Sequence, residues 1–142
     1  MVEIKNIAVV DDHIMFRKGL AVLINKFPGY HVMFEAANGK EFIDRLNPIL
    51  LPDIVLLDVN MPEMDGYETA EWLRIHQPGI KVLALSMMDT ETAIFKMVKQ
   101  GAKGYLLKDA EPEELKLAFD EVLNHGYFYN DLVTPEIVQS LS

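Results

Sequence analysis

Five polar residues that could do chemistry in this sequence lie at the ends of short apolar segments. They are Asp11, Asp12, Asp58, Ser86 and Lys108. The apolar segments are rich in β-branched residues, which favours strands of a parallel sheet that are buried on both faces. Because the carboxyl ends of parallel strands lie at one edge of the sheet, where such folds bind ligands, we expect the five side chains to converge there.

Three carboxylates in one pocket need a compensating positive charge. Two carboxylates about 4 Å apart repel by roughly 4 kcal/mol at an effective dielectric of about 20, so Asp11, Asp12 and Asp58 favour a bound cation. Ligands that are all oxygen point to a hard ion, and Mg²⁺ suits a shallow, open site. With Lys108 as a second positive charge and Ser86 as a hydroxyl donor, the set contains the groups needed to transfer a phosphoryl group to Asp58.

Each residue of this set also has a plain structural explanation when it is taken alone. Asp12 could cap the helix that follows it, Ser86 could satisfy a turn, and Lys108 could be a solvated surface charge. His13, next to the acidic pair, is expected in the first turn of a helix rather than as a metal ligand or a base. The convergence of several such residues on one edge favours the chemical interpretation.

Five strand patterns alternate with five helical patterns along the chain. The expected strands are residues 4–10, 31–36, 54–57, 80–85 and 104–107. The expected helices are residues 16–27, 38–46, 66–76 and 89–101 and a fifth helix that begins at residue 112, with Asn38, Asp65 and Asp89 as caps. This alternation predicts an α/β domain with a parallel sheet, right-handed crossovers and helices on both faces.

The composition is that of one globular domain. The chain has 142 residues, 50% of them hydrophobic. Its 13 Lys and Arg against 22 Asp and Glu give a net charge of −9, which repels a nucleic-acid backbone. The absence of cysteine excludes disulfides and thiolate metal sites and suits a reducing compartment. With no signal-peptide pattern and no apolar run of about 20 residues, the sequence predicts a cytoplasmic domain without membrane contact.

Four motifs together give about residues 5–124 a specific resemblance to the receiver domain of two-component response regulators. The motifs are Val9-Val10-Asp11-Asp12-His13, Leu57-Asp58-Val59-Asn60-Met61-Pro62-Glu63-Met64-Asp65-Gly66, Ser86, and Gly104-Tyr105-Leu106-Leu107-Lys108. The resemblance implies a flavodoxin-like, doubly wound (βα)5 fold with a five-stranded parallel sheet of order 2-1-3-4-5. It also implies that the domain is not an enzyme and catalyses only its own phosphorylation and dephosphorylation.

The same resemblance implies a phosphoacceptor and a metal site. Asp58 would accept a phosphoryl group from a phosphohistidine on a sensor histidine kinase or phosphotransfer protein. Asp12, Asp58 and the backbone carbonyl of Asn60 would ligate Mg²⁺ directly, with Asp11 acting through water.

A conformational switch is implied as well. Ser86 and Lys108 would contact the phosphoryl oxygens, and Tyr105 would be the aromatic residue that changes rotamer and turns inward on activation. Phosphorylation would thereby change the surface that acts on the output, and one possible output is a homodimer formed on phosphorylation.

The subclass is indicated by residues 11–20 and 104–110, which resemble the LuxR-type regulators, whose receiver is followed by a helix-turn-helix DNA-binding domain. The alternating pattern stops after His125, and Thr134 with Pro135 favours the start of a short helix. We therefore predict a receiver domain over residues 1–125 and the start of an interdomain linker over residues 126–142, with the output domain absent. Control of transcription and contact with DNA would come only through that absent domain.

Three alternatives stay open from the sequence. The first is a free-standing receiver, and the second is an interaction module that works without phosphate. The third is a phosphatase of the haloacid dehalogenase type, whose nucleophilic aspartate also follows an apolar strand. Such enzymes use a second carboxylate two residues later as acid and base, and this chain has Asn60 there, which disfavours the third alternative.

Overall fold

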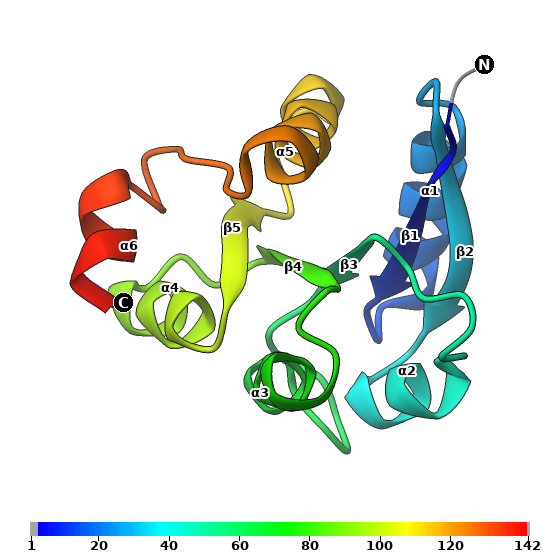
Figure 1. Cartoon of the computed structure of the whole chain (residues 1–142), viewed down its shortest axis with the longest axis horizontal. Coiled ribbons are helices and arrows are strands. Elements are labelled where there is room, and N and C mark those ends of the chain that lie inside the picture. Colours follow the sequence, from blue (N-terminus) through cyan, green and yellow to red (C-terminus); the bar gives the residue numbers. More distant parts are fainter. Residues whose placement is uncertain (1–2, 142) are drawn as a thin grey trace.

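The computed structural model describes residues 3–141, which fold around one parallel sheet (Figure 1). The strands are β1 (Lys5–Val10), β2 (Tyr30–Ala36), β3 (Ile54–Leu57), β4 (Lys81–Ser86) and β5 (Ala102–Leu107). The helices are α1 (Ile14–Asn25), α2 (Gly39–Arg45), α3 (Gly66–His76), α4 (Glu91–Lys99), α5 (Pro112–His125) and α6 (Pro135–Leu141). The strand order is β2-β1-β3-β4-β5, and all neighbours are parallel. The predicted flavodoxin-like fold is thus confirmed.

Strand β3 lies at the centre of the sheet and is buried on both faces. Val55 and Leu57 join the apolar core beneath α2, α3 and α4, whereas Ile54 and Leu56 join the core beneath α1 and α5 (Figure 1). Successive side chains of a strand point to opposite faces. Because helices cover both faces, all four residues of β3 are apolar and no polar residue alternates with them.

Side-chain caps begin the helices close to the predicted positions. Asn38 and Asp65 cap α2 and α3 as predicted. The prediction that Asp89 caps the fourth helix is wrong, because the N-cap of α4 is Thr90, whose Oγ1 accepts a hydrogen bond from the amide of Ala93 at 3.2 Å. Aspartate and threonine are both good caps, so two adjacent candidates competed for this position.

Strand β5 is an edge strand, and the chain that follows α5 covers it. It begins two residues earlier than predicted. The amide of Phe128 donates a hydrogen bond to the carbonyl of Lys103 at 2.9 Å, and the side chains of Phe128 and Val133 are buried. Helix α6 then lies against α4 (Figure 1). That a linker begins at residue 126 stays a prediction, although the segment packs on the domain in this structure.

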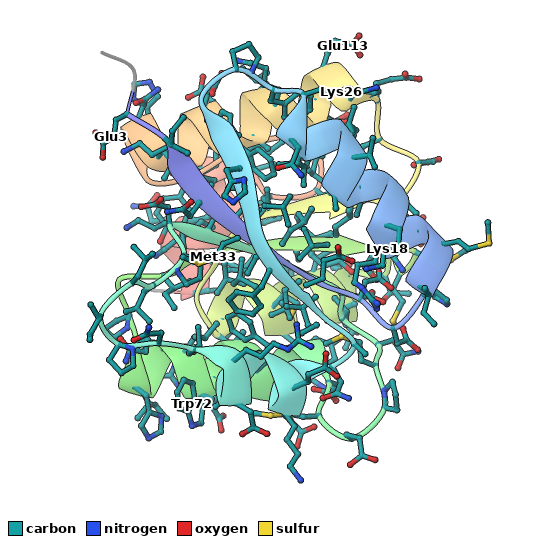
Figure 2. All side chains as sticks on the ribbon, turned by 90° about the vertical axis from the view of Figure 1, so that its right-hand side faces the viewer. Glu3, Lys18, Lys26, Met33, Trp72 and Glu113 are labelled. Carbon is teal, nitrogen blue, oxygen red and sulfur yellow. The ribbon has the colours of Figure 1, made fainter. Side chains whose placement is uncertain are left out.

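Charged side chains cover the outer faces of the helices. Figure 2 shows Lys18 on α1, Lys26 at its end and Glu113 in the first turn of α5 pointing outward, and all three are exposed. Trp72 lies partly buried on α3. Within residues 3–141, no helix combines the length and the apolar character that crossing a membrane requires.

Gly66 is the position where added volume should disturb the loop that carries Asp58. A Cβ at Gly66 would lie 2.3 Å from the carbonyl oxygen of Asp58 and 2.7 Å from the Cα of Val59, so the backbone would have to shift. We expect Gly66→Ala to lower the free energy of unfolding by about 1–3 kcal/mol in urea titrations. Gly79→Ala is the control, since beyond its two chain neighbours no atom lies within 4 Å of a Cβ added there, and it should change the value by less than about 0.5 kcal/mol. Equal effects of the two substitutions would contradict this prediction.

Candidate functional site

The carboxylate of Asp58 is fixed at the carboxyl end of β3 by backbone contacts. Its amide donates a hydrogen bond to the carbonyl of Val10 at 3.0 Å, which continues the pairing of β3 with β1. Its Oδ1 accepts a hydrogen bond from the amide of Val59 at 2.8 Å. Asp58 is only 4% exposed, so its second oxygen, Oδ2, faces a pocket largely shielded from water.

The ammonium of Lys108 connects the carboxylates of this pocket. Its Nζ lies 2.8 Å from Oδ2 of Asp11 and 3.2 Å from Oδ2 of Asp58. Nδ1 of His13 is a third neighbour at 2.9 Å, and the centre of the Phe16 ring lies 4.9 Å away. The side chain of Lys108 is 9% exposed, so the alternative that it is a solvated surface charge is wrong.

The turn from β1 into α1 places Asp11 and Asp12. Oδ1 of Asp11 accepts a hydrogen bond from the amide of His13 at 2.8 Å. The N-cap of α1 is His13, without a side-chain capping bond, so the alternative that Asp12 caps this helix is wrong. Oδ1 of Asp12 is instead buried without a hydrogen-bond partner among the described residues. Buried polar atoms are normally satisfied, so this oxygen points to a ligand that the chain itself does not supply.

The donors in this pocket fit a hard divalent cation. One ligand atom from each of Asp11, Asp12, His13 and Asp58 lies within 4.8 Å of the others. Three of the four are carboxylate oxygens, which are the ligands that Mg²⁺ prefers. A cation at this position would also satisfy the unpartnered oxygen of Asp12. The residues present therefore fit the predicted magnesium site.

The charges in the pocket are not balanced. Burial raises the pKa of the Asp58 carboxyl above its ordinary value, and the negative charge of Asp11 raises it further. The Lys108 ammonium and the hydrogen bond from the Val59 amide lower the pKa, but they do not cancel the rise. A further positive charge in the pocket would therefore favour the ionised form of Asp58.

Ser86 and Tyr105 lie next to the pocket, and neither makes a hydrogen bond to Asp58 among the contacts of residues 3–141. Oγ of Ser86 accepts a hydrogen bond from the amide of Met88 at 3.1 Å. This bond agrees with the structural explanation that Ser86 satisfies a turn. Tyr105 is fully buried, and its hydroxyl donates to the carbonyl of Met88 at 2.5 Å. Burial raises the pKa of Tyr105 to about 12. The switch roles of both residues, and the ligand role of the exposed Asn60, stay predictions.

Two side chains at the site have contacts that the sequence did not indicate. His13 lies at the start of α1 as expected, but its ring also contacts Lys108. Nη1 of Arg17 donates to the carbonyl of Asp11 at 2.7 Å, and its Nε donates to Oε1 of Glu35 at 3.0 Å. Arg17 lies one helical turn after His13, since its amide bonds to the His13 carbonyl. The four-residue spacing from His13 to Arg17 is the sequence signal that could have predicted the contact of Arg17 with the site.

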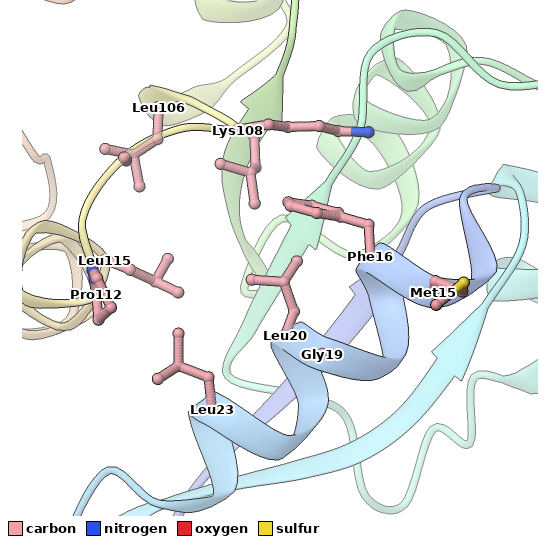
Figure 3. A pocket seen from close by; sticks show the side chains of 11 residues that line it. Met15, Phe16, Gly19, Leu20, Leu23, Leu106, Lys108, Pro112 and Leu115 are labelled. Carbon is pink, nitrogen blue, oxygen red and sulfur yellow. The ribbon is translucent and has the colours of Figure 1, made fainter.

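An apolar groove of about 360 Å³ opens beside Lys108, between α1 and the start of α5. Figure 3 shows Phe16 and Leu23 of α1 on one side of the groove and Leu115 of α5 on the other. Lys108, which directly follows β5, also lines this groove. The charged pocket is thus next to an apolar surface that a protein partner could cover.

Comparison with known proteins agrees with this geometry. The chain matches the response regulator receiver domain over residues 7–120. The chain belongs to this family. The nitrate/nitrite response regulator NarL of Escherichia coli K12 is 38% identical to the receiver over 135 residues. These residues are 95% of the chain and 62% of NarL, so the chain spans less than two thirds of this relative.

Solved structures share the fold of the receiver. A LuxR family two-component response regulator from Aurantimonas sp. SI85-9A1 has a TM-score of 0.81 at 32% identity, over 98% of the present chain and 96% of that chain. CheY of Borrelia burgdorferi, solved in a complex with CheX, BeF3 and Mg²⁺, has a TM-score of 0.77 at 26% identity, over 84% of the present chain and 89% of that chain. Both agree with the predicted receiver fold.

The raised pKa of Asp58 predicts a pH-dependent stability when divalent cations are removed by a chelator. Folding then favours protonated Asp58, so the wild type loses stability as the pH rises from about 4 through the folded-state pKa. We expect Asp58→Asn to raise the melting temperature at about pH 7, and we expect this gain to shrink as the pH falls toward about 4. Circular dichroism melts check this, with Asp44→Asn, an exposed carboxylate on α2, as the unaffected control. A lower melting temperature for Asp58→Asn near neutral pH would contradict it.

Proposed function

We propose that the receiver accepts a phosphoryl group on Asp58 from a phosphohistidine of a sensor histidine kinase or phosphotransfer protein, with Mg²⁺ as cofactor. The observation that carries this proposal is the position of the Lys108 ammonium, 2.8 Å from Asp11 and 3.2 Å from Asp58, in a pocket where an oxygen of Asp12 has no hydrogen-bond partner among the described residues. A buried carboxylate nucleophile, an ammonium and further carboxylates for a cation are the groups that phosphoryl transfer to a side chain requires.

The transfer is a substitution at phosphorus. An Oδ atom of Asp58 forms the new bond, and the bond from phosphorus to the donor's imidazole nitrogen breaks, leaving its electron pair on that nitrogen. Lys108 offsets the negative charge of the phosphoryl oxygens, and the Ser86 hydroxyl donates a hydrogen bond to one of them. The product is a mixed anhydride on Asp58.

The metal would be held by carboxylates from two loops. Asp12, Asp58 and the carbonyl of Asn60 would ligate Mg²⁺ directly and Asp11 through water, and the bound ion would supply positive charge to the phosphoryl oxygens. The CheY complex supports a magnesium ion in this fold, since it was solved with both Mg²⁺ and BeF3.

Partners and output follow from the same proposal. The donor protein would approach over the apolar groove between α1 and α5, next to Lys108. We further propose that the receiver acts in the cytoplasm and controls transcription through a DNA-binding domain. The similarity to a LuxR family response regulator and to the transcriptional regulatory protein DegU supports the transcriptional output. Phosphorylation would favour a homodimer as part of that output.

Phosphorylation can be tested with a small donor. Incubation with acetyl phosphate and Mg²⁺ should add one phosphoryl group, seen by intact-mass spectrometry. Asp58→Asn should abolish the adduct because the acceptor oxygen is lost, and Lys108→Met should slow its formation by roughly a hundredfold. Asp109→Asn, an exposed carboxylate beside Lys108, is the matched control and should react at the wild-type rate. The proposal fails if the wild type forms no adduct or if Asp58→Asn forms one as readily.

Magnesium should stabilise the receiver without any phosphodonor. At 100 times its dissociation constant, a ligand of the folded state adds about 2.7 kcal/mol to the free energy of unfolding. Urea titrations with and without Mg²⁺ measure this gain. Asp12→Asn should lose most of it because a carboxylate ligand is removed, whereas Asp44→Asn should keep it. A gain of the same size in Asp12→Asn would argue against the site.

A further inference from the structure

The chain after α5 forms a C-terminal strap, residues 127–141, along the outer edge of β5. The amide of Phe128 donates a hydrogen bond to the carbonyl of Lys103 at 2.9 Å. Nδ2 of Asn130 donates to the carbonyl of Tyr105 at 3.0 Å. Lys103 and Tyr105 are two residues apart, so their carbonyls point to the same, outer side of this edge strand. The strap therefore satisfies two groups that the sheet itself leaves open.

Asn130 also folds the strap. Its Oδ1 accepts hydrogen bonds from the backbone amides of Leu132 at 3.0 Å and Val133 at 2.9 Å. The backbone amide of Asn130 donates to the carbonyl of Val133 at 3.0 Å. Val133 is fully buried in the same core as Tyr105. One side chain thus shapes the turn with its oxygen and attaches that turn to β5 with its nitrogen.

The far end of the strap rests on α4. Val138 and Leu141 of α6 pack against the core that contains Met97 and Val98 of α4. In Figure 1, α6 and α4 lie side by side at the edge of the molecule beyond β5. A shift of α4 would therefore change the surface on which α6 lies.

A series of hydrogen bonds runs from Ser86, next to the pocket, to the strap. Oγ of Ser86 accepts from the amide of Met88, and the carbonyl of Met88 accepts from the hydroxyl of Tyr105. The carbonyl of Tyr105 accepts from Asn130. Two residues after Met88, Thr90 caps the start of α4. The loop of Met88 thus contacts Ser86 and Tyr105 and leads directly into α4.

We propose that the C-terminal strap is a latch, closed by Asn130, that phosphorylation of Asp58 releases. This inference rests on the proposed function. A phosphoryl oxygen that draws in the Ser86 hydroxyl changes the acceptor of the Met88 amide, and the loop moves with it. The start of α4 and the carbonyl of Met88, which accepts from the Tyr105 hydroxyl, then shift beneath the strap. The strap loses its contacts with β5 and α4 as a result. By linkage, a loosened strap favours phosphorylation by the same factor by which phosphorylation favours release.

Amide hydrogen exchange at Phe128 measures the latch, because this amide bonds to Lys103 and not to Asn130. The wild type is treated with acetyl phosphate and Mg²⁺, the adduct is quantified by mass on the same sample, and exchange is followed by NMR. We expect exchange at Phe128 to rise by roughly fivefold or more on phosphorylation. Asp58→Asn in the same mixture should show no rise.

Asn130→Asp separates the two functions of this side chain. Aspartate keeps the oxygen that accepts from Leu132 and Val133, but it loses the donor to Tyr105. We expect exchange at Phe128 in the unmodified variant to be roughly threefold to tenfold faster than in the wild type, with a smaller further rise on phosphorylation. Asn124→Asp, at an exposed position of α5 outside the strap, adds the same charge without touching the bonds of Asn130, and its Phe128 amide should exchange at the wild-type rate.

The outcomes separate the latch from the phosphorylation on which it depends. An adduct on Asp58 with unchanged exchange at Phe128 overturns the latch and leaves the proposed function intact. Wild-type exchange in unmodified Asn130→Asp overturns the role of Asn130. The absence of any adduct in the wild type overturns the proposed function, and the release by phosphorylation with it.

Discussion

The structure of the site depends on one ammonium group held between buried carboxylates. Lys108 supplies a single positive charge against Asp11, Asp12 and Asp58, so the pocket keeps an excess of negative charge. Burial and, after it, the negative charge of Asp11 raise the pKa of Asp58 above its ordinary value. Because this excess is built into the fold, the pocket favours a cation, and in the proposed function the charge of that cation would offset the charge of an anionic phosphoryl group.

The sheet supplies the geometry that this charge arrangement requires. The register of β1 with β3 sets Val10 opposite Leu57, so the acidic residues that follow both strands emerge side by side. Beyond β3, the amide of Lys108 donates to the carbonyl of Ser86 at 2.9 Å, which aligns the ends of β5 and β4. Cores on both faces hold this register, while the loops at the strand ends carry the chemistry.

Much of this arrangement could be predicted from the sequence, because periodicity and the ends of apolar segments are local properties. The parallel sheet and the meeting of the acidic residues with Lys108 followed from them, whereas the strand order was an implication of the resemblance to receiver domains. The choice between Asp89 and Thr90 as a cap did not, since both side chains can accept the capping hydrogen bond. The contact of His13 with Lys108 depends on loop path and rotamer, neither of which the residue type determines.

The packing of the C-terminal strap on β5 could not be predicted from the sequence, for a physical reason. An edge strand favours cover, but no residue pattern says which segment will provide it. Residues 127–130 have no helical or strand periodicity in their apolar residues, because the strap bonds to β5 only at isolated points. Phe128 and Asn130 make these bonds. The path from the pocket to these residues passes through backbone groups of Met88 and Tyr105. Each of these hydrogen bonds joins a side chain to a backbone group, and because backbone groups are common to all residue types, the pairing of the two leaves no sequence motif.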